Sequence, residues 1–157
     1  MSATNRTPQQ EAYFRAERRA IACKSRVSRT PIPDELDSYP VRIDGREVGL
    51  LRKFAGGSWS AVYTVDGASL RVADDMPQRS ALHMLKVVVM EEDERRVVAE
   101  LDVAVELVRD LMPAGVMIRR GLREIRRVLL DGSMSPAVAT MNAVHVLAHV
   151  TGVNASR

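Results

Sequence analysis

Three tight-turn signals constrain the fold of this 157-residue chain more than any other feature. They are Asp44-Gly45, the "AGG" of 55–57 and Asp66-Gly67, and they are evenly spaced. Asp and Gly tolerate the positive φ angles that two-residue hairpin turns require. The segments between the turns alternate in polarity, most clearly in "SWSAVYTV" at 58–65, as half-buried strands do. The pattern predicts an antiparallel β-meander of three or four strands over residues 41–73.

Helical patterns flank the meander, and the first predicted helix runs from Thr7 to Arg29. Thr7 is its expected N-cap, Pro8 its first residue and Glu11 an acid in its first turn. Its apolar face is thin and consists of Tyr13, Phe14, Ala20, Ile21 and Val27. Its basic residues are Arg15, Arg18, Arg19, Lys24, Arg26 and Arg29. We expect either a weakly docked helix or one that orders on a partner. The proline-rich and acidic segment "TPIPDELDSYP" at 30–40 then predicts a linker.

A second helical pattern covers residues 77–111, after the expected start signal Met76-Pro77. Its middle, "EEDERR" at 91–96, is wholly charged and indicates a break or an exposed turn of helix. Beyond it an apolar seam follows a heptad spacing: Val98, Leu101, Val105, Val108 and Met112. The seam is typical of a core-facing stripe, and a homo-oligomer joined through residues 98–112 is the alternative.

Two further helices are predicted after the break at Pro113 and Gly115. One covers 116–130, and the other begins at Ser135-Pro136 and ends near Val150. Apart from its histidines the last helix is uncharged, which predicts a buried, central helix. The fold class is therefore α+β, with a basic N-terminal helix and a small meander packed with a C-terminal helical unit. The predicted domain segments are 1–38 for the basic helix and linker, 39–90 for the meander plus helix, and 91–157 for the C-terminal helical unit. The last two segments can also form one continuous domain.

Basic residues are the main functional signal. The formal net charge is only +3, but all except three of the 23 basic residues are arginine. A GC-rich genome is one cause of such an excess. The other is function, because the planar guanidinium fork matches phosphates and base edges better than an ammonium group does.

The stretch "IRRGLREIRRVLLDG" at 118–132 concentrates this signal. At about 100° per residue, Ile118, Leu122, Ile125 and Leu129 share one side of a helix. The opposite side holds five arginines and a single acid, Glu124; the arginines are Arg119, Arg120, Arg123, Arg126 and Arg127. Like charges three or four residues apart cost a few tenths of a kcal/mol per pair. Nucleic-acid phosphates, salt bridges to carboxylates such as those of "EEDE", or genome bias alone can account for the pattern.

A helix-turn-helix reader of base edges is disfavoured. Its second helix must present polar or basic side chains to the bases. Here the second helix offers Thr140, Asn142, His145 and His149 among apolar groups. We therefore expect the arginine helix itself to contact the phosphates.

The meander offers a second candidate surface. Its "G…R…GG.W.A…DG" pattern followed by "RSALHML" resembles, over residues 41–86, the three-stranded-sheet-plus-helix DNA-binding domains of the plant ethylene-response-factor and integrase arm-binding type. The resemblance implies that the sheet lies in the major groove. The matching sheet residues are Arg46, Arg52, Lys53 and Trp59, and the packing-helix residues are Ala81, Leu82 and Leu85. The chain departs from this pattern in its acids Asp66, Asp74 and Asp75, and a generic meander with Trp59 in its core is the alternative.

Catalytic, cofactor and metal sites are not predicted. No nucleophile elbow, phosphate-cradling glycine loop or dinucleotide fingerprint occurs, and His145 and His149 have no third ligand at a diagnostic spacing. Cys23 is the single cysteine, so a disulfide framework is excluded. The polar N-terminus lacks a signal-peptide core, and no apolar run reaches the roughly 20 residues of a membrane span. We expect a cytoplasmic protein with no membrane contact.

These observations predict a small, non-enzymatic nucleic-acid-binding accessory protein of phage or mobile-element origin, with DNA as the expected nucleic acid. The arginine-rich helices would contact the phosphates. The alternative is a structural or interaction protein, an oligomeric assembly component whose arginine face pairs with acids of a partner or neighbouring subunit.

Overall fold

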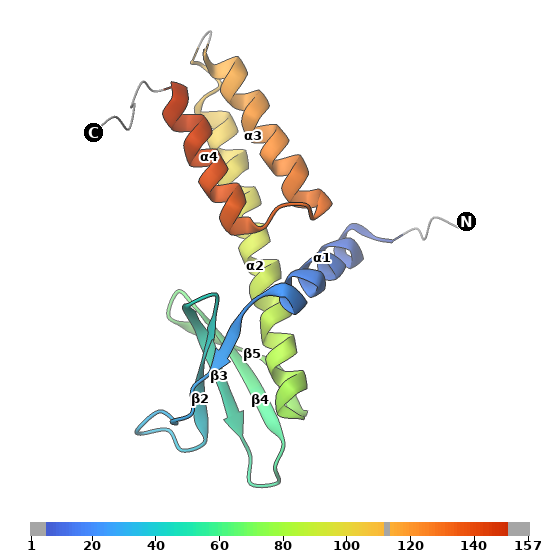
Figure 1. Ribbon diagram of the computed structural model, residues 1–157, viewed down its shortest axis with the longest axis vertical. Helices are drawn as coiled ribbons and strands as arrows, with labels where there is room; N and C mark the ends of the chain where they lie inside the picture. The colour runs from blue at the N-terminus through green and yellow to red at the C-terminus, as the bar shows by residue number, and fades with distance from the viewer. Residues whose placement is uncertain (1–5, 112–113, 151–157) are drawn as a thin grey trace. The chain divides into compact units, whose positions relative to one another are not determined.

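The computed structural model describes residues 6–111 and 114–150 and has the α+β organisation expected (Figure 1). The elements in chain order are α1 (Pro8–Ala22), β1 (Ser25–Val27), β2 (Ser38–Ile43), β3 (Arg46–Lys53), β4 (Trp59–Val65), β5 (Ala68–Met76), α2 (Gln78–Leu107), α3 (Ala114–Asp131) and α4 (Pro136–Val150). The chain divides into two compact units, Met1–Glu91 and Glu92–Arg157, which we call the sheet unit and the helical unit. Helix α2 contributes its first part to the sheet unit and its second part to the helical unit.

The meander is confirmed, with five antiparallel strands in the order β1-β2-β3-β4-β5. Two hairpins turn at the predicted dipeptides. Asp44 and Gly45 have φ of 47° and 83°, and Asp66 and Gly67 have φ of 49° and 77°. Positive φ at both central residues is the geometry of a two-residue turn that matches the twist of the strands. The expected count of three or four strands is too low, because β1 comes from outside the predicted range.

Strand β1 corrects the predicted extent of the first helix, which ends at Ala22 and not at Arg29. Cys23 caps it with extended backbone, and Val27 then pairs with Val41 of β2. The backbone N–H of Lys24 donates to the Asp44 carboxylate at 3.0 Å, and the Asp44 N–H donates to the Lys24 carbonyl at 2.8 Å. Pairing with a distant strand thus overrides local helix propensity, and Lys24, Arg26 and Arg29 are not helical. The predicted linker is also shorter than expected, because β2 already begins at Ser38.

Helix α1 begins as predicted and docks through small residues. Ala16 and Ala20 are buried in the core of the sheet unit beside Leu51 of β3 and Leu85 of α2. The aromatic and branched residues expected on its apolar face, Tyr13, Phe14 and Ile21, are exposed instead. Two alanines allow close approach but bury little area, so we classify α1 as a weakly docked helix.

The N-cap of α1 provides a first prediction. The Thr7 hydroxyl accepts from the Gln10 N–H at 3.3 Å, and the Gln10 side chain accepts from the Thr7 N–H at 2.9 Å. Thr7→Ala removes one half of this capping box and should lower the free energy of unfolding by about 1 kcal/mol. Chemical unfolding followed by circular dichroism measures the change. Thr7→Ser retains the hydroxyl and should behave like wild type; an equal loss in both variants would show that the cap hydroxyl is unimportant.

Helix α2 continues through the charged segment 91–96, where a break was one expectation. Glu92 and Asp93 form ion pairs three residues apart with Arg95 and Arg96 at 2.5 and 3.1 Å. Such pairs are favourable on a helix surface, so the segment is an exposed turn of continuous helix. The helix ends at Leu107, before the predicted 111.

The core of the helical unit is aliphatic and combines α2, α3 and α4. Leu101 and Val108 of the heptad seam are buried in it, and Val98 and Val105 are half-buried against it. Met112 lies outside the described residues. These positions support the reading of the seam as a core-facing stripe over self-association through it.

Helix α4 departs from the expectation of a buried, central helix. Ser135 caps it as predicted, its hydroxyl accepting from the Val138 N–H at 3.3 Å. Pro136 and Ala139 are buried, but Val138, Met141 and Val144 are exposed. Apolar composition alone cannot show how many sides of a helix its neighbours cover, and here only one side packs into the core of the unit.

Candidate nucleic-acid interface

Helix α3 holds the predicted arginine face in a defined orientation. Ile118, Leu122, Ile125 and Leu129 are all buried in the core of the helical unit, as the periodicity predicted. A helix anchored along one side must expose the other. Arg120, Arg123 and Arg127 are exposed, and Arg119 and Arg126 are partly buried.

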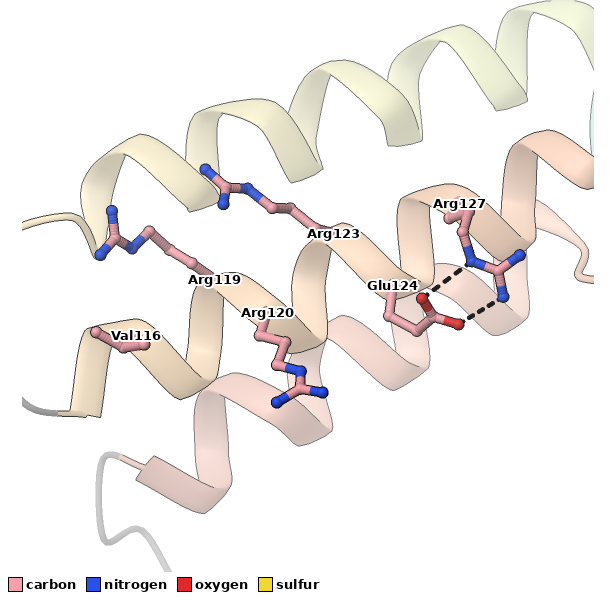
Figure 2. A pocket seen from close by; sticks show the side chains of 6 residues that line it. All are labelled: Val116, Arg119, Arg120, Arg123, Glu124 and Arg127. Atoms are coloured by element: carbon pink, nitrogen blue, oxygen red, sulfur yellow. Dashed lines mark hydrogen bonds and ion pairs between the residues drawn. The ribbon is translucent and has the colours of Figure 1, made fainter.

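An open hollow of about 590 Å³ lies along this exposed side. Its lining, drawn in Figure 2, is Val116, Arg119, Arg120, Arg123, Glu124 and Arg127. In this view the guanidinium groups of Arg119 and Arg123 extend to one side of α3, and that of Arg120 extends to the other. The hollow is therefore a surface depression between long cationic side chains and not an enclosed pocket.

Arg127 is neutralised within its own helix. Its Nε and Nη2 donate to the two carboxylate oxygens of Glu124 at 3.0 and 2.6 Å, and Asp131 lies 3.6 Å from Nη1. The hydrogen bond from Arg127 lowers the pKa of Glu124, and the same bond raises the pKa of Arg127. A hydrogen bond from Ser133 lowers the pKa of Asp131. All three groups are charged at neutral pH, so Arg127 offers little net charge to an external anion.

Arg126 serves an internal contact between helices. Its Nε donates to Asp102 of α2 at 3.0 Å. This is an internal salt bridge of the kind that the sequence left open, although Asp102 was not among the acids expected as partners. Arg126 thus ties α3 to α2 within the helical unit.

The other three arginines of the face have no carboxylate within ion-pair distance, although the charge of Arg120 contributes to the lowered pKa of Glu124. In the part of the chain that the structure describes, Arg119, Arg120 and Arg123 form no ion pair. Arg119 donates from Nε to the Gly115 carbonyl oxygen at 3.4 Å, a contact that leaves its charge uncompensated. Within the predicted face, Arg119, Arg120 and Arg123 therefore form the subset available to an external anion, and we call them the arginine triad.

The basic residues of α1 and β1 belong to the sheet unit and are dispersed in it. Arg18 is exposed, Arg15 and Arg19 are half-buried on α1, and Lys24 lies between α1 and β1. Their predicted grouping with Arg26 and Arg29 on one helix is wrong, because those two residues lie on and after β1.

A second basic hollow, of about 430 Å³, forms where β1 meets β2. Its lining is Arg26, Ser28, Arg29, Thr30, Pro40, Arg42 and Glu47. Arg26 lies directly opposite Arg42 in the antiparallel register, an arrangement that repulsion between like charges disfavours. The sequence reading missed Arg42. Arg42 follows Pro40 by two residues, so both lie on one face of β2. Its cross-strand neighbour Arg26 could be found only by placing Ser25–Val27 in a strand.

The four sheet residues implied by the family resemblance do not share a face. Trp59 pairs with Lys53 on the face that carries Leu51 and Ala61, where its half-buried ring lies 5.6 Å from that of Tyr39. Arg52 is on the opposite face and contacts Ser38 at 3.2 Å and Glu35 at 3.5 Å. Arg46 pairs with Ile43 at a hairpin end. Trp59 therefore packs against the core, as in a generic meander.

The sheet face opposite this core carries a different set of arginines. Strand alternation and register place Arg26, Arg42, Arg52 and Arg71 there. Arg52 pairs with Glu35, and Arg71 with Asp74 at 3.2 Å. Arg71 is a second residue that the sequence reading missed; its place follows from its pairing with Val62, because a register shift between Ala61 and Val62 interrupts the simple alternation along β5.

Residues 6–111 and 114–150 give little support for a metal site, a membrane-spanning helix or a reactive cysteine. These residues contain no group of three or more His, Cys, Asp and Glu side chains that could hold a metal ion, and no helix among them is long and apolar enough to span a bilayer. Burial raises the pKa of Cys23, which favours the unreactive thiol form. His83 lies 3.7 Å from Glu17, and the side chain of His149 is outside the described residues.

Comparisons with protein-family models, curated proteins and solved structures found no match. The functional argument therefore rests on the geometry of the chain itself.

Proposed function

We propose that this protein is a nucleic-acid-binding accessory protein that contacts phosphates through the arginine triad. The observation that carries the proposal is that Arg119, Arg120 and Arg123 form no ion pair in the described chain and line the outer side of an anchored helix. Guanidinium forks bind phosphate oxygens through paired, charge-assisted hydrogen bonds. Anion binding also removes the repulsion between neighbouring arginines.

Duplex DNA is the nucleic acid that the surface favours. Proteins that bind single strands combine cations with aromatic side chains on which the bases stack. Helix α3 contains no aromatic residue. Cations without a stacking platform are typical of contacts to a duplex backbone, which position a protein without reading sequence.

The test is a salt titration of a labelled duplex with wild type and with Arg119/Arg120/Arg123→Ala. Each lost phosphate contact lowers the slope of log affinity against log salt by about 1. We expect the triple variant to lose about three units of slope and at least roughly tenfold in affinity at low salt. Fluorescence anisotropy measures both quantities, and a labelled single strand should bind more weakly than the duplex.

The matched control is Arg95/Arg96/Arg109→Ala, which removes the same charge from the same unit. These arginines are already paired with Glu92, Asp93 and Glu106 at 2.5, 3.1 and 3.6 Å. We expect the control to bind within about twofold of wild type, because neutralised arginines release few counterions. Absence of wild-type binding at low salt, or equal losses in both triple variants, would refute the proposal.

The second candidate function is a non-enzymatic structural or interaction protein. The observation that favours it is the row of apolar side chains that α4 exposes. A cytoplasmic location and an origin in a phage or mobile element are compatible with both candidates and are part of the proposal.

A further inference from the structure

Helix α4 presents an exposed side that is mostly apolar and that also carries the exposed His145. Val138, Met141 and Val144 are 40%, 56% and 60% exposed. Their three-residue spacing places them along one side of the helix. No Asp, Glu, Lys or Arg occurs anywhere in Pro136–Val150. The exposed surface therefore carries no acidic, lysine or arginine side chain, and His145 is the one ionisable side chain described on it.

The apolar surface continues from α4 onto α2 across a shallow groove of about 150 Å³. The groove is lined by Val97, Glu100, Leu101 and Ala104 of α2 and by Thr140, Ala143, Val144 and Leu147 of α4. On the α2 side Leu107 is 76% exposed and follows Ala104 by three residues, so it extends the same side of the helix. Val103, 58% exposed, lies beside Leu107. We call Val103, Leu107, Val138, Met141 and Val144, together with the groove, the α4 face.

The size of this face is close to what an interface requires. At about 100 Å² for each fully exposed aliphatic side chain, the five residues expose on the order of 300 Å² of apolar surface. A standard protein interface buries about 800 Å² on each partner, a little over half of it apolar. The α4 face thus supplies most of the apolar area that one side of a stable dimer needs.

We propose that a second copy of this chain covers the α4 face in a twofold-symmetric homodimer. In such an interface the same patch meets itself, so any charge on it would lie near its own like charge. The α4 face has few such groups, because α4 brings no Asp, Glu, Lys or Arg, Glu100 is the one acid in the groove lining, and His145 is the one ionisable side chain described on the exposed side of α4. A strongly acidic or basic partner would find no Asp, Glu, Lys or Arg on α4 with which to pair. The inference does not depend on the proposed nucleic-acid function, whose residues lie on the outer side of α3.

The first experiment is sedimentation velocity with multi-angle light scattering on the full chain, without nucleic acid. We expect wild type at tens of micromolar to have twice the monomer mass of 17.4 kDa. Met141→Glu/Val144→Glu places like charges against each other at the twofold axis and should weaken association at least roughly 100-fold, giving a monomer. The control Leu36→Glu/Leu70→Glu makes the same charge change at exposed apolar residues of the sheet unit and should remain dimeric.

A second variant keeps the test decisive if the glutamates disturb folding. In a Cys23→Ser background, Met141→Cys should form a disulfide-linked dimer under mild oxidation, and Leu36→Cys should not. A wild-type monomer at 100 µM would overturn the proposal. So would a well-folded glutamate variant that stays dimeric, or crosslinking of Met141→Cys no greater than that of Leu36→Cys.

Discussion

Gly49→Ala is expected to destabilise the sheet unit by about 3 kcal/mol, at the upper end of what overpacking usually costs. Gly49 lies in β3 between Val41 of β2 and Tyr63 of β4. A Cβ added there would overlap the carbonyl oxygen of Val62. That oxygen belongs to the backbone of a central strand, so it cannot move aside without breaking the ladder.

The tryptophan makes this prediction easy to measure. Trp59 is the only tryptophan in the chain and lies on β4, the strand next to Gly49, so its fluorescence reports on the sheet unit. The Gly49→Ala variant should show a clearly lower urea midpoint by this probe. Gly56→Ala is the matched control, because a Cβ at Gly56 would meet nothing within 4 Å; its stability should change by less than about 0.5 kcal/mol. Coincident midpoints for the two variants would show that the sheet relaxes around the added methyl group.

Leu122→Ala should destabilise the helical unit by about 3 to 4 kcal/mol. Leu122 is fully buried on the core-facing side of α3, the helix that carries the arginine triad. Removing three carbons from such a site loses transfer free energy and leaves a cavity. Circular dichroism at 222 nm follows the helices, and this probe should separate from tryptophan fluorescence in the variant, since the sheet unit contains Trp59.

The control for this prediction is Met117→Ala on the same helix. Met117 is 67% exposed, so its truncation should cost less than about 0.5 kcal/mol. Binding of duplex DNA should follow stability: it should fall in Leu122→Ala under conditions in which the helical unit unfolds, and remain intact in Met117→Ala. A Leu122→Ala variant as stable as Met117→Ala would mean that α3 is not anchored by this side.

Features that depend on short-range chemistry could be predicted from the sequence. The Asp-Gly turns define their hairpins because few residues tolerate positive φ. The buried side of α3 follows from the spacing of Ile118, Leu122, Ile125 and Leu129, and the start of α4 follows from Ser135 and Pro136. Each of these signals is contained within a few turns of chain.

Features that depend on residues distant in the chain could not be predicted from the sequence. Strand β1 exists because Val41 and its neighbours offer a pairing edge, and three residues give no periodicity by which to find it. Arg126 faces a carboxylate 24 residues away on another helix, so its charge could not be distinguished from those of the triad. The apolar pattern of α4 describes its composition, and only its neighbours decide which side is covered.

The two outer strands of the sheet differ in charge: β1 is basic, whereas β5 carries Arg71, which pairs with Asp74, together with Asp75. Lys24, Arg26 and Arg29 accompany β1, whereas Asp74 and Asp75 lie near the end of β5. Unpaired edge strands invite strand-by-strand growth with other chains. Two features of β5 oppose this growth: its register shifts twice against β4, and Asp75 adopts a left-handed φ of 48°. The irregular backbone of β5 thus makes this edge of the sheet a poor template for pairing with another strand.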